Sequence, residues 1–437
     1  MPPQKEAPNT PPPQTFPSAT SRVKVDLWDT ATPTPNFNED TSNANFYIIQ
    51  PTTTAIKTLI FWNSERICNQ YDTCDCANWT TDPACTATMR TSRILQELAD
   101  HPKVMGVIRD LAGATDPVSL NPIASFYTPW DACYDDPGTD CIDAGCLANR
   151  QTYANELAGA IRNYILDQAN NTYTSTQYVI LVGYDAQIPF YRMHDGTSIY
   201  PEDEYIAEVS LDPCTTMGSA LDDSYYLTDN YYSELSPEES DLASNPYAYL
   251  NDFAIGRLVE TPEQIEDVIH TFLAQDGQVN ALPDVTGENR ILVTGFDFLY
   301  DTAKQIDLAF DQDGYTPGGD LDELLDNPAP GQEGDEYTPA MLEAALYPTN
   351  PDDEVHRIAN INTHANHYSF AASQAGSGDE SLYCTDATYN PTLCYQGSDM
   401  ASQSRDLKGT VLYTSGCHSG LPVPSTDGKP QIGRAHV

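Results

Sequence analysis

The sequence predicts an α/β protein whose mostly parallel sheets are covered by helices on both faces. Short runs of β-branched and aromatic residues alternate along the chain with segments whose apolar residues recur at helical spacing. Most of these runs are apolar throughout, which is typical of strands buried between two layers of helices. The alternation occurs before and after a Gly-, Pro- and Asp-rich stretch at residues 276–288, so we expect two sheet-bearing halves.

The chain begins with a Pro- and Thr-rich segment, residues 1–50, which we expect to be a linker. Its scattered apolar residues allow one edge strand. The first half follows at residues 51–280. Its expected strands are residues 56–62, 104–108, 178–182 and 253–255. Its expected helices are residues 92–100, 155–168 and 261–274, the last opened by a cap at Thr261 with Pro262 and Gln264 behind it.

A long insertion rich in tyrosine and acidic residues occupies residues 193–251 of the first half. It shows little periodicity, and loops of this length are uncommon unless they are functional or disordered. The second half, residues 281–430, is expected to hold a strand at 291–294, helices at 302–310 and 339–345, a loop at 311–336 and two further strands. Residues 431–437 match the translation of a sequencing adapter, so we expect the native sequence to stop near Pro430.

The charge and the cysteines restrict the class of protein. A formal net charge of −44 argues against binding to nucleic acid or to an anionic membrane, since both need a basic surface. No stretch of 18 apolar residues is present, so we expect no membrane insertion. The 11 cysteines cluster without a C-x-x-C pair, which favours disulfides in an oxidising compartment over zinc. Ten can pair, and Cys417 is the natural odd member.

Two predicted strand ends carry the residues of a thiol–imidazole pair. One strand ends in a polar turn with His364, and the other breaks at small residues before Cys417. Because ligands sit outside the carboxyl ends of parallel strands, both side chains are expected at the same edge of a sheet. A cysteine attacks as a thiolate, and a neighbouring imidazole stabilises that thiolate and later donates the proton. The Cys417 amide could donate into an oxyanion hole.

The segments HRIANINTHANH (356–367) and GTVLYTSGCHSG (409–420), in this order, resemble the caspase-like cysteine peptidases and most closely the gingipain-like family. Further matching segments are TLIFWN (58–63), YVILVGYDAQIP (178–189), AIGRLVE (254–260) and ILVTGFDF (291–298). The resemblance implies a caspase-like three-layer α/β/α fold. It also implies an endopeptidase, extracellular or on the cell surface of a prokaryote, that acts on proteins or peptides. Cys417 is then the nucleophile and His364 the general acid and base.

Alternatives remain at several of these positions. His367 and His418 compete with His364 for the role of base, and His364 with His367 could instead bind a metal, although few carboxylates are near. The resemblance puts Asp223 where Arg-specific relatives have a pocket carboxylate, and Asp222 or Asp229 serve that argument almost as well. The same acidic loop could bind calcium, but the thiol chemistry requires no cofactor.

The reaction also has alternatives. A processing peptidase or transpeptidase for surface proteins would share the Cys–His pair but act on one defined substrate. A catalytically silent module of the same fold would serve in adhesion or as a scaffold. Because the sequence retains both His364 and Cys417, we favour the active endopeptidase.

Overall fold

The structure is a computed structural model, and the part of the chain that it describes has gaps. The described residues are 24–26, 39–41, 53–134, 146, 148–197, 201–209, 211–235, 238–239, 247–278, 290–296, 299–312, 321–325, 337–348, 355–371, 394–396, 399–400, 403, 407, 409–415, 418 and 421. The chain divides into two compact units, residues 1–55 and residues 56–437.

The first unit contains two short strands, β1 (Lys24–Asp26) and β2 (Glu39–Thr41), and a 3-10 turn, η1 (Thr53–Ala55). The two strands pair with each other in antiparallel fashion. The edge strand that the sequence allowed in this region is therefore part of a separate hairpin.

The second unit begins with a four-stranded parallel sheet in the order β10-β5-β3-β4. The strands are β3 (Thr58–Trp62), β4 (Gly106–Asp110), β5 (Tyr178–Val182) and β10 (Ala254–Leu258). All four lie at or within three residues of the positions expected from the sequence. The apolar runs predicted them well because β3 and β5 are buried between helices.

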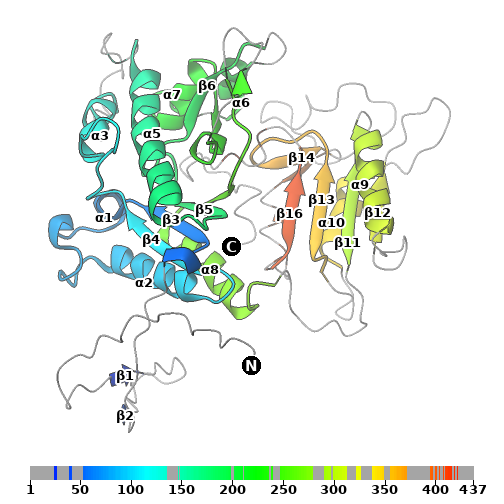
Figure 1. The fold of residues 1–437 in the computed structure, drawn as a ribbon. Coiled ribbons are helices and arrows are strands. Elements are labelled where there is room, and N and C mark those ends of the chain that lie inside the picture. The colour runs from blue at the N-terminus through cyan, green and yellow to red at the C-terminus, as the bar shows by residue number, and fades with distance from the viewer. Residues whose placement is uncertain are drawn as a thin grey trace, which may run out of the picture. The chain divides into compact units, whose positions relative to one another are not determined.

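Helices cover both faces of this sheet, as Figure 1 shows with α3 and α5 above it and α2 and α8 below. The helices are α1 (Ser64–Tyr71), α2 (Thr86–Asp100), α3 (Ala124–Asp131), α5 (Arg150–Asp167) and α8 (Pro262–Ala274). Alternate strand residues serve the two faces: Leu59 packs with α3 and α5, whereas Ile60 packs with α1, α2 and α8. The predicted cap of α8 is present, with Thr261 and Gln264 in a capping box.

The insertion is folded, contrary to the expectation of a long segment with little structure. It contains a hairpin of β6 (Tyr191–His194) with β7 (Tyr225–Thr228), two helices and a 3-10 turn, η4 (Asn230–Tyr232). The helices are α6 (Glu202–Val209) and α7 (Thr216–Asp222). The two-residue strands β8 (Glu238–Glu239) and β9 (Tyr247–Ala248) also pair. Buried tyrosines, such as Tyr205 and Tyr232, supply the apolar area that periodicity did not reveal.

The second half contains another four-stranded parallel sheet, in the order β12-β11-β13-β16. Its strands are β11 (Ile291–Gly295), β12 (Leu321–Leu325), β13 (Ile358–Asn362) and β16 (Val411–Thr414), and its helices are α9 (Tyr300–Gln312) and α10 (Pro339–Leu346). Val293 faces α9 and Leu292 faces α10, so this sheet too has a helix on each face. Two short strands, β14 (Ser369–Ala371) and β15 (Cys394–Gln396), pair beside it.

β12 lies inside the region that the sequence analysis assigned to a loop, so that prediction is wrong. The strand is an edge strand of sequence LDELL, and only its first and last residues are buried. Its acidic side chains are paired with bases: Asp322 contacts His356 at 2.8 Å, and Glu323 contacts Lys304 at 2.9 Å.

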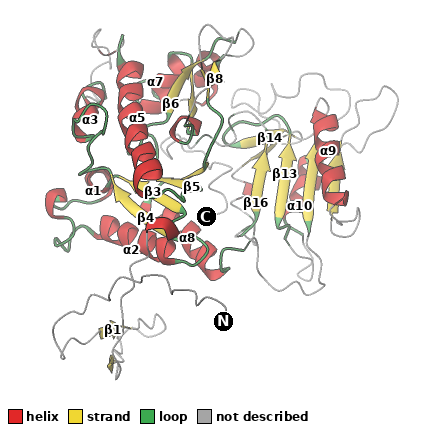
Figure 2. Ribbon diagram, in the orientation of Figure 1, coloured by secondary structure: helices red, strands yellow, loops and turns green. Residues whose placement is uncertain are grey.

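The two sheets have the same topology. In each, the second strand in chain order lies on one side of the first, and the third and fourth lie on the other side. The chain therefore reverses direction across the sheet between β3 and β5, and again between β11 and β13. Such a switch point leaves a crevice outside the carboxyl ends of the strands, where α/β proteins bind ligands. In Figure 2 the arrowheads of β13 and β16 point to the same edge of the second sheet.

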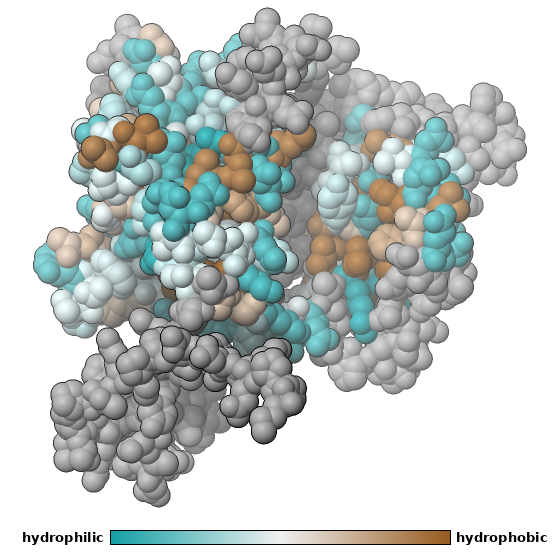
Figure 3. All heavy atoms as spheres, viewed as in Figure 1, coloured by the Kyte–Doolittle hydropathy of each residue, from teal (hydrophilic) through white to brown (hydrophobic). Residues whose placement is uncertain are grey.

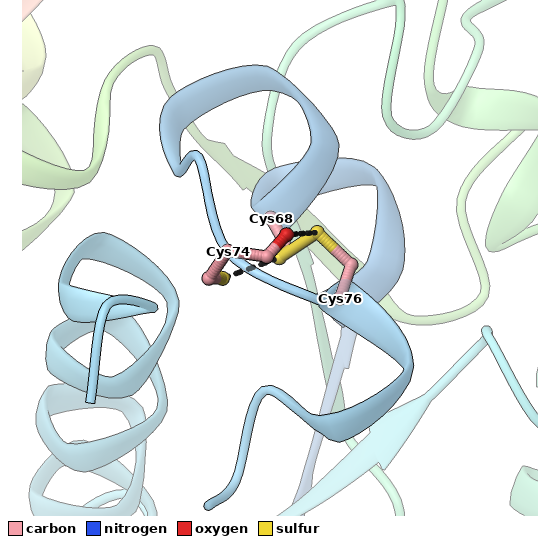
Figure 4. A group of neighbouring side chains, drawn as sticks. All are labelled: Cys68, Cys74 and Cys76. Carbon is pink, nitrogen blue, oxygen red and sulfur yellow. Dashed lines mark hydrogen bonds between the residues drawn. A yellow bond between two sulfur atoms is a disulfide. The ribbon is translucent and has the colours of Figure 1, made fainter. Parts of the chain in front are cut away.

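All eight cysteines of the described residues are disulfide-bonded. Cys68 pairs with Cys76, Cys74 with Cys85, and Cys133 with Cys146. Cys214 and Cys394 are also bonded, to partners outside the described residues. Figure 4 shows Cys68, Cys74 and Cys76 close together, with 3.3 Å between the Cys68 and Cys74 sulfur atoms. The bonds Cys68–Cys76 and Cys74–Cys85 cross in sequence and fix the loop between α1 and α2.

This pairing gives a direct chemical prediction. When the unreduced protein is denatured and alkylated, mass mapping should find the label on Cys417 alone, because ten cysteines are expected to be in disulfides. The same protein should carry label on all 11 cysteines after reduction, which shows that every peptide can be detected. Label on any of the eight bonded cysteines of the described residues, or on none at all, would contradict the framework.

The surface is mixed in character. On the face seen in Figure 3, hydrophilic residues dominate the described surface and hydrophobic ones are scattered among them. Large exposed hydrophobic residues include Val411 and Tyr413 of β16, the edge strand of the second sheet. Among the described helices, none combines the length and the apolar character needed to cross a bilayer.

Candidate active site

The candidate site lies at the carboxyl edge of the second sheet, where β13 and β16 run side by side. The two strands are in register, with Ile361 opposite Thr414. One residue further on, the Ser415 hydroxyl lies 3.0 Å from the side-chain oxygen of Asn362. The same asparagine accepts at its backbone oxygen from the Phe296 amide at 2.9 Å. Three strands are thus tied together at this edge.

His364 follows β13 by two residues and stands on this edge. Its ring meets the Phe296 ring edge-on, with 5.1 Å between the ring centres, and Phe296 follows β11 directly. His364 therefore lies at the switch point between β11 and β13. His364 is only partly buried, unlike the core residues before it.

The turn after His364 is built by its own polar residues. The side-chain oxygen of Asn366 accepts from the Tyr368 amide at 3.0 Å and from the Ser369 amide at 2.7 Å. The His364 backbone oxygen accepts from the Ala371 amide at 2.8 Å. Asparagine favours such turns because its side chain can replace backbone hydrogen bonds. These bonds fix the backbone that presents the imidazole.

Cys417 lies outside the described residues, so its side chain has no described geometry. Its described neighbours in sequence are Ser415, at the end of β16, and His418. The backbone of His418 is in the left-handed region, with φ of 57°. A residue with a Cβ rarely adopts this region, so the local turn is held by contacts of its surroundings.

The two competing histidines are both committed to other contacts. His367 is fully buried, and its Nδ1 lies 2.9 Å from the Tyr205 hydroxyl. His418 Nε2 lies 3.0 Å and 2.9 Å from the two carboxylate oxygens of Glu202. The pattern His364-x-x-His367 does not form a metal site among the described residues, where the possible ligand groups consist of disulfide cysteines with Asp82.

Asp223 lies at the end of α7 and is paired with a buried base. Its oxygens accept from Arg150 at 2.7 Å and 2.8 Å, and from the Gln151 amide at 2.9 Å. The Arg150 side chain is 3% exposed, and that of Asp223 is 29% exposed. Asp222 meets Arg150 at 3.2 Å, and Asp229 pairs with Arg257. Each of the three candidate pocket acids is therefore already in an ion pair.

Sequence reasoning missed the contribution of α6 to this region. Glu202 and Tyr205 come from the insertion, yet they touch His418 and His367, which lie 216 and 162 residues away in sequence. A local sequence pattern cannot predict such long-range contacts. The one available signal was the acidic first turn of α6, with Glu202, Asp203 and Glu204 after Pro201, which is typical of a helix start.

Of the known proteins compared with this chain, only solved structures are similar to it. No protein-family model and no curated protein matches this chain. A complex of the RgpB pro- and mature domains from Porphyromonas gingivalis is similar with a TM-score of 0.41 and 11% identity, over 82% of this chain and 54% of that chain. The Arg-specific cysteine proteinase gingipain R (RGPB) is similar with a TM-score of 0.39 and 10% identity, over 84% and 56% of the two chains.

A third structure, described as a protease, is similar with a TM-score of 0.39 and 12% identity, over 87% of this chain and 56% of that chain. The chain spans about half the length of the solved chains it matches.

Proposed function

We propose that this protein is a cysteine endopeptidase in which Cys417 and His364 act as a pair. The observation that carries the proposal is the pairing of β13 with β16, which are adjacent, parallel and in register. His364 follows the end of β13 by two residues, and Cys417 follows the end of β16 by three. Adjacent parallel strands deliver the residues that follow them to one edge of the sheet, here beside a switch point.

The proposed reaction needs only this chain's own groups. The Cys417 thiolate attacks the carbonyl carbon of the scissile peptide, and the His364 imidazolium gives its proton to the leaving amine. The resulting thioester is hydrolysed by water, from which His364 takes a proton. The bond between the acyl carbon and the Cys417 sulfur breaks, the acid product dissociates, and the thiolate and imidazolium are restored. No metal or other cofactor takes part in either step.

The direct test is labelling with a thiol-directed peptide probe, followed by mass mapping of the modified residue. We expect one label per chain, on Cys417, and competition by peptide substrates. Hydrolysis of a peptide library by the same preparation identifies an endopeptidase, whereas transfer of the acyl group to an added amine identifies a transpeptidase. A folded protein that takes no label and cleaves no peptide would be the silent module.

We further propose that Asp223 contributes to a preference for a basic residue before the cleaved bond. A carboxylate has about four lone-pair positions, and Arg150 with Gln151 occupies three of those on Asp223. One position remains, so Asp223 can accept a single hydrogen bond from a substrate cation. Such a charge-assisted bond corresponds to roughly a 10- to 100-fold preference.

In a positional-scanning peptide library we expect cleavage after Arg or Lys, and Asp223→Ala should erase that preference. The readout is the ratio of kcat/KM values for basic and apolar substrates on one preparation. Loss of the Arg150 pair also destabilises the variant, but a smaller folded fraction does not change that ratio. A parent enzyme that cleaves after apolar or acidic residues would disprove this role of Asp223.

The disulfides bear on where in or outside the cell this protein acts. Disulfides in the described part of the chain persist in oxidising environments and are rare in the cytosol. We therefore propose that the enzyme acts outside the cell or on the surface of a prokaryote, on protein or peptide substrates.

A further inference from the structure

Helix α6 of the insertion touches both of the segments on which the proposed peptidase site depends. The Tyr205 hydroxyl lies 2.9 Å from His367 Nδ1 and accepts from the His367 backbone amide at 3.2 Å. Tyr205 is 2% exposed. His367 belongs to the turn that presents His364, so this one side chain fixes two atoms of that turn.

The same helix also fixes the residue directly after Cys417. The Tyr205 ring stacks on the His418 ring, with 3.6 Å between ring centres and 9° between planes. Both oxygens of the Glu202 carboxylate lie within hydrogen-bonding distance of His418 Nε2. The Glu202 side chain is 13% exposed and the His418 side chain is 18% exposed. These contacts hold His418 in its left-handed conformation, which is unfavourable for a side chain with a Cβ.

A third contact involves Leu421, which follows His418 by three residues. The Leu421 amide donates to the His418 backbone oxygen at 2.9 Å, and the Leu421 side chain packs against a small buried cluster of Tyr205, Leu211 and Leu221. Before Cys417, Ser415 is tied to Asn362. Described residues before and after Cys417 are therefore anchored by contacts with β13 and with the insertion.

Helix α6 is itself held firmly enough to act as an anchor. The Glu202 amide donates to the Asp195 carboxylate at 3.1 Å, and the Asp195 amide donates to the Ser224 backbone oxygen at 2.7 Å. Asp195 and Ser224 flank the β6–β7 hairpin. The helix start is thus joined to the rest of the insertion.

We propose that α6 is a positioning element of the peptidase: Tyr205 and Glu202 hold the turn that carries His364 and the residue that follows Cys417. The inference rests on the proposed function and assigns a role to the insertion. Neither residue takes part in bond making or breaking. They act through His367 and His418, whose fixed positions keep the imidazole and the thiol at reacting distance, where a displacement of about 1 Å costs about 100-fold in rate.

A purely structural role for α6 gives a different result. If the helix only attached the insertion to the rest of the protein, loosening it would lower the unfolding temperature and leave the folded enzyme's kcat unchanged. The distinguishing measurements are therefore kcat and KM separately, and the rate at which iodoacetamide alkylates Cys417, all on protein shown to be folded.

The test compares Tyr205→Phe and Glu202→Gln with Glu204→Gln as the matched control. Tyr205→Phe keeps the ring stack and removes the hydroxyl, and Glu202→Gln keeps the shape and removes the charge. Glu204 is on the same helix, and its side chain is exposed. We expect both test variants to lower kcat by about 10- to 100-fold with KM nearly unchanged, and to change the alkylation rate of Cys417. The control should match the parent.

The outcomes separate this inference from the proposed function. A parent protein that neither cleaves peptides nor takes a peptide probe at Cys417 would refute the peptidase, while the alkylation rates of the variants would still report on the anchoring of Cys417. An active parent whose Tyr205→Phe and Glu202→Gln variants keep its kcat and its alkylation rate would refute the positioning role alone. Equal losses in Glu204→Gln would refute it as well.

Discussion

Cys417→Ala is expected to lower kcat/KM for peptide hydrolysis by at least about 10⁴-fold while the protein remains folded. The nucleophile is lost entirely, and alanine offers no substitute. The fold should persist because Ser415, two residues before Cys417, is already exposed. Hydrolysis of a fluorogenic peptide, with circular dichroism as the check on folding, measures both parts of the prediction.

His364→Ala should be nearly as severe, because general acid–base catalysis contributes about 10²–10⁴-fold. It should also slow alkylation of Cys417 near neutral pH, since an adjacent imidazolium stabilises the thiolate. The double variant should be little worse than either single one, because residues that act as a unit are not additive. His270→Ala is the matched control, as this histidine belongs to α8, which packs on the first sheet, and its side chain is 54% exposed.

Two results would contradict this assignment in different ways. If Cys417→Ala keeps the activity of the parent, the protein is not a cysteine peptidase of this kind. If His364→Ala leaves the pH profile of Cys417 alkylation unchanged, the imidazole beside the thiol is another one. The structure makes His367 a poor alternative, since it is fully buried and its Nδ1 is engaged by Tyr205.

The strands that could be found from the sequence are those that form apolar runs. β5 coincides with its predicted range and β11 differs by one residue, because each is an apolar run between two helical layers. β12 was missed because an edge strand with two buried leucines and two acidic residues among its three partly buried positions has no such signature. Its Glu323 accepts from Lys304 and its Asp322 pairs with His356, and both partners are distant in sequence.

In the candidate site too, some features could be predicted from local sequence and others could not. The expectation that His364 follows a strand end required only local pattern, and β13 ends two residues before it. The pairing of Asp223 with Arg150, and the contacts of α6 with His367 and His418, depend on residues 73 to 216 positions apart. Nothing in a single sequence encodes such proximity locally. The insertion was therefore predicted as a loop, although Tyr205 forms a small buried cluster with Leu211 and Leu221.

The other large effect is expected at the ion pair between Asp185 and Arg192, which joins the first sheet to the insertion. Asp185 follows β5, and its two oxygens meet the Arg192 guanidinium at 2.7 Å and 2.6 Å. Both side chains are fully buried. Asp185 also accepts from the Phe190 amide at 2.8 Å. Asp185→Asn leaves a buried guanidinium without a counter-charge, which costs about 3–5 kcal/mol of unfolding free energy.

Urea unfolding of Asp185→Asn should show this loss, and Asp185→Leu combined with Arg192→Met should lose much less, because removing both charges removes the desolvation penalty too. Asp203→Asn, an exposed acid on α6, is the control that should match the parent. If the double variant is as unstable as Asp185→Asn, the cost comes from packing and not from the unpaired charge.

The same pair predicts how stability depends on pH. Burial raises the pKa of the Asp185 carboxyl, but the charge of Arg192 and the hydrogen bonds from Arg192, Thr216 and Phe190 together lower it further, so the folded pKa lies below its ordinary value. A lowered folded pKa contributes stability above the unfolded pKa and loses it as the pH falls through the folded one. The difference in unfolding free energy between the parent and Asp185→Asn should therefore shrink as the pH falls through the acid range. A difference that stays constant from neutral to acid pH would show that the carboxylate charge does not stabilise this junction.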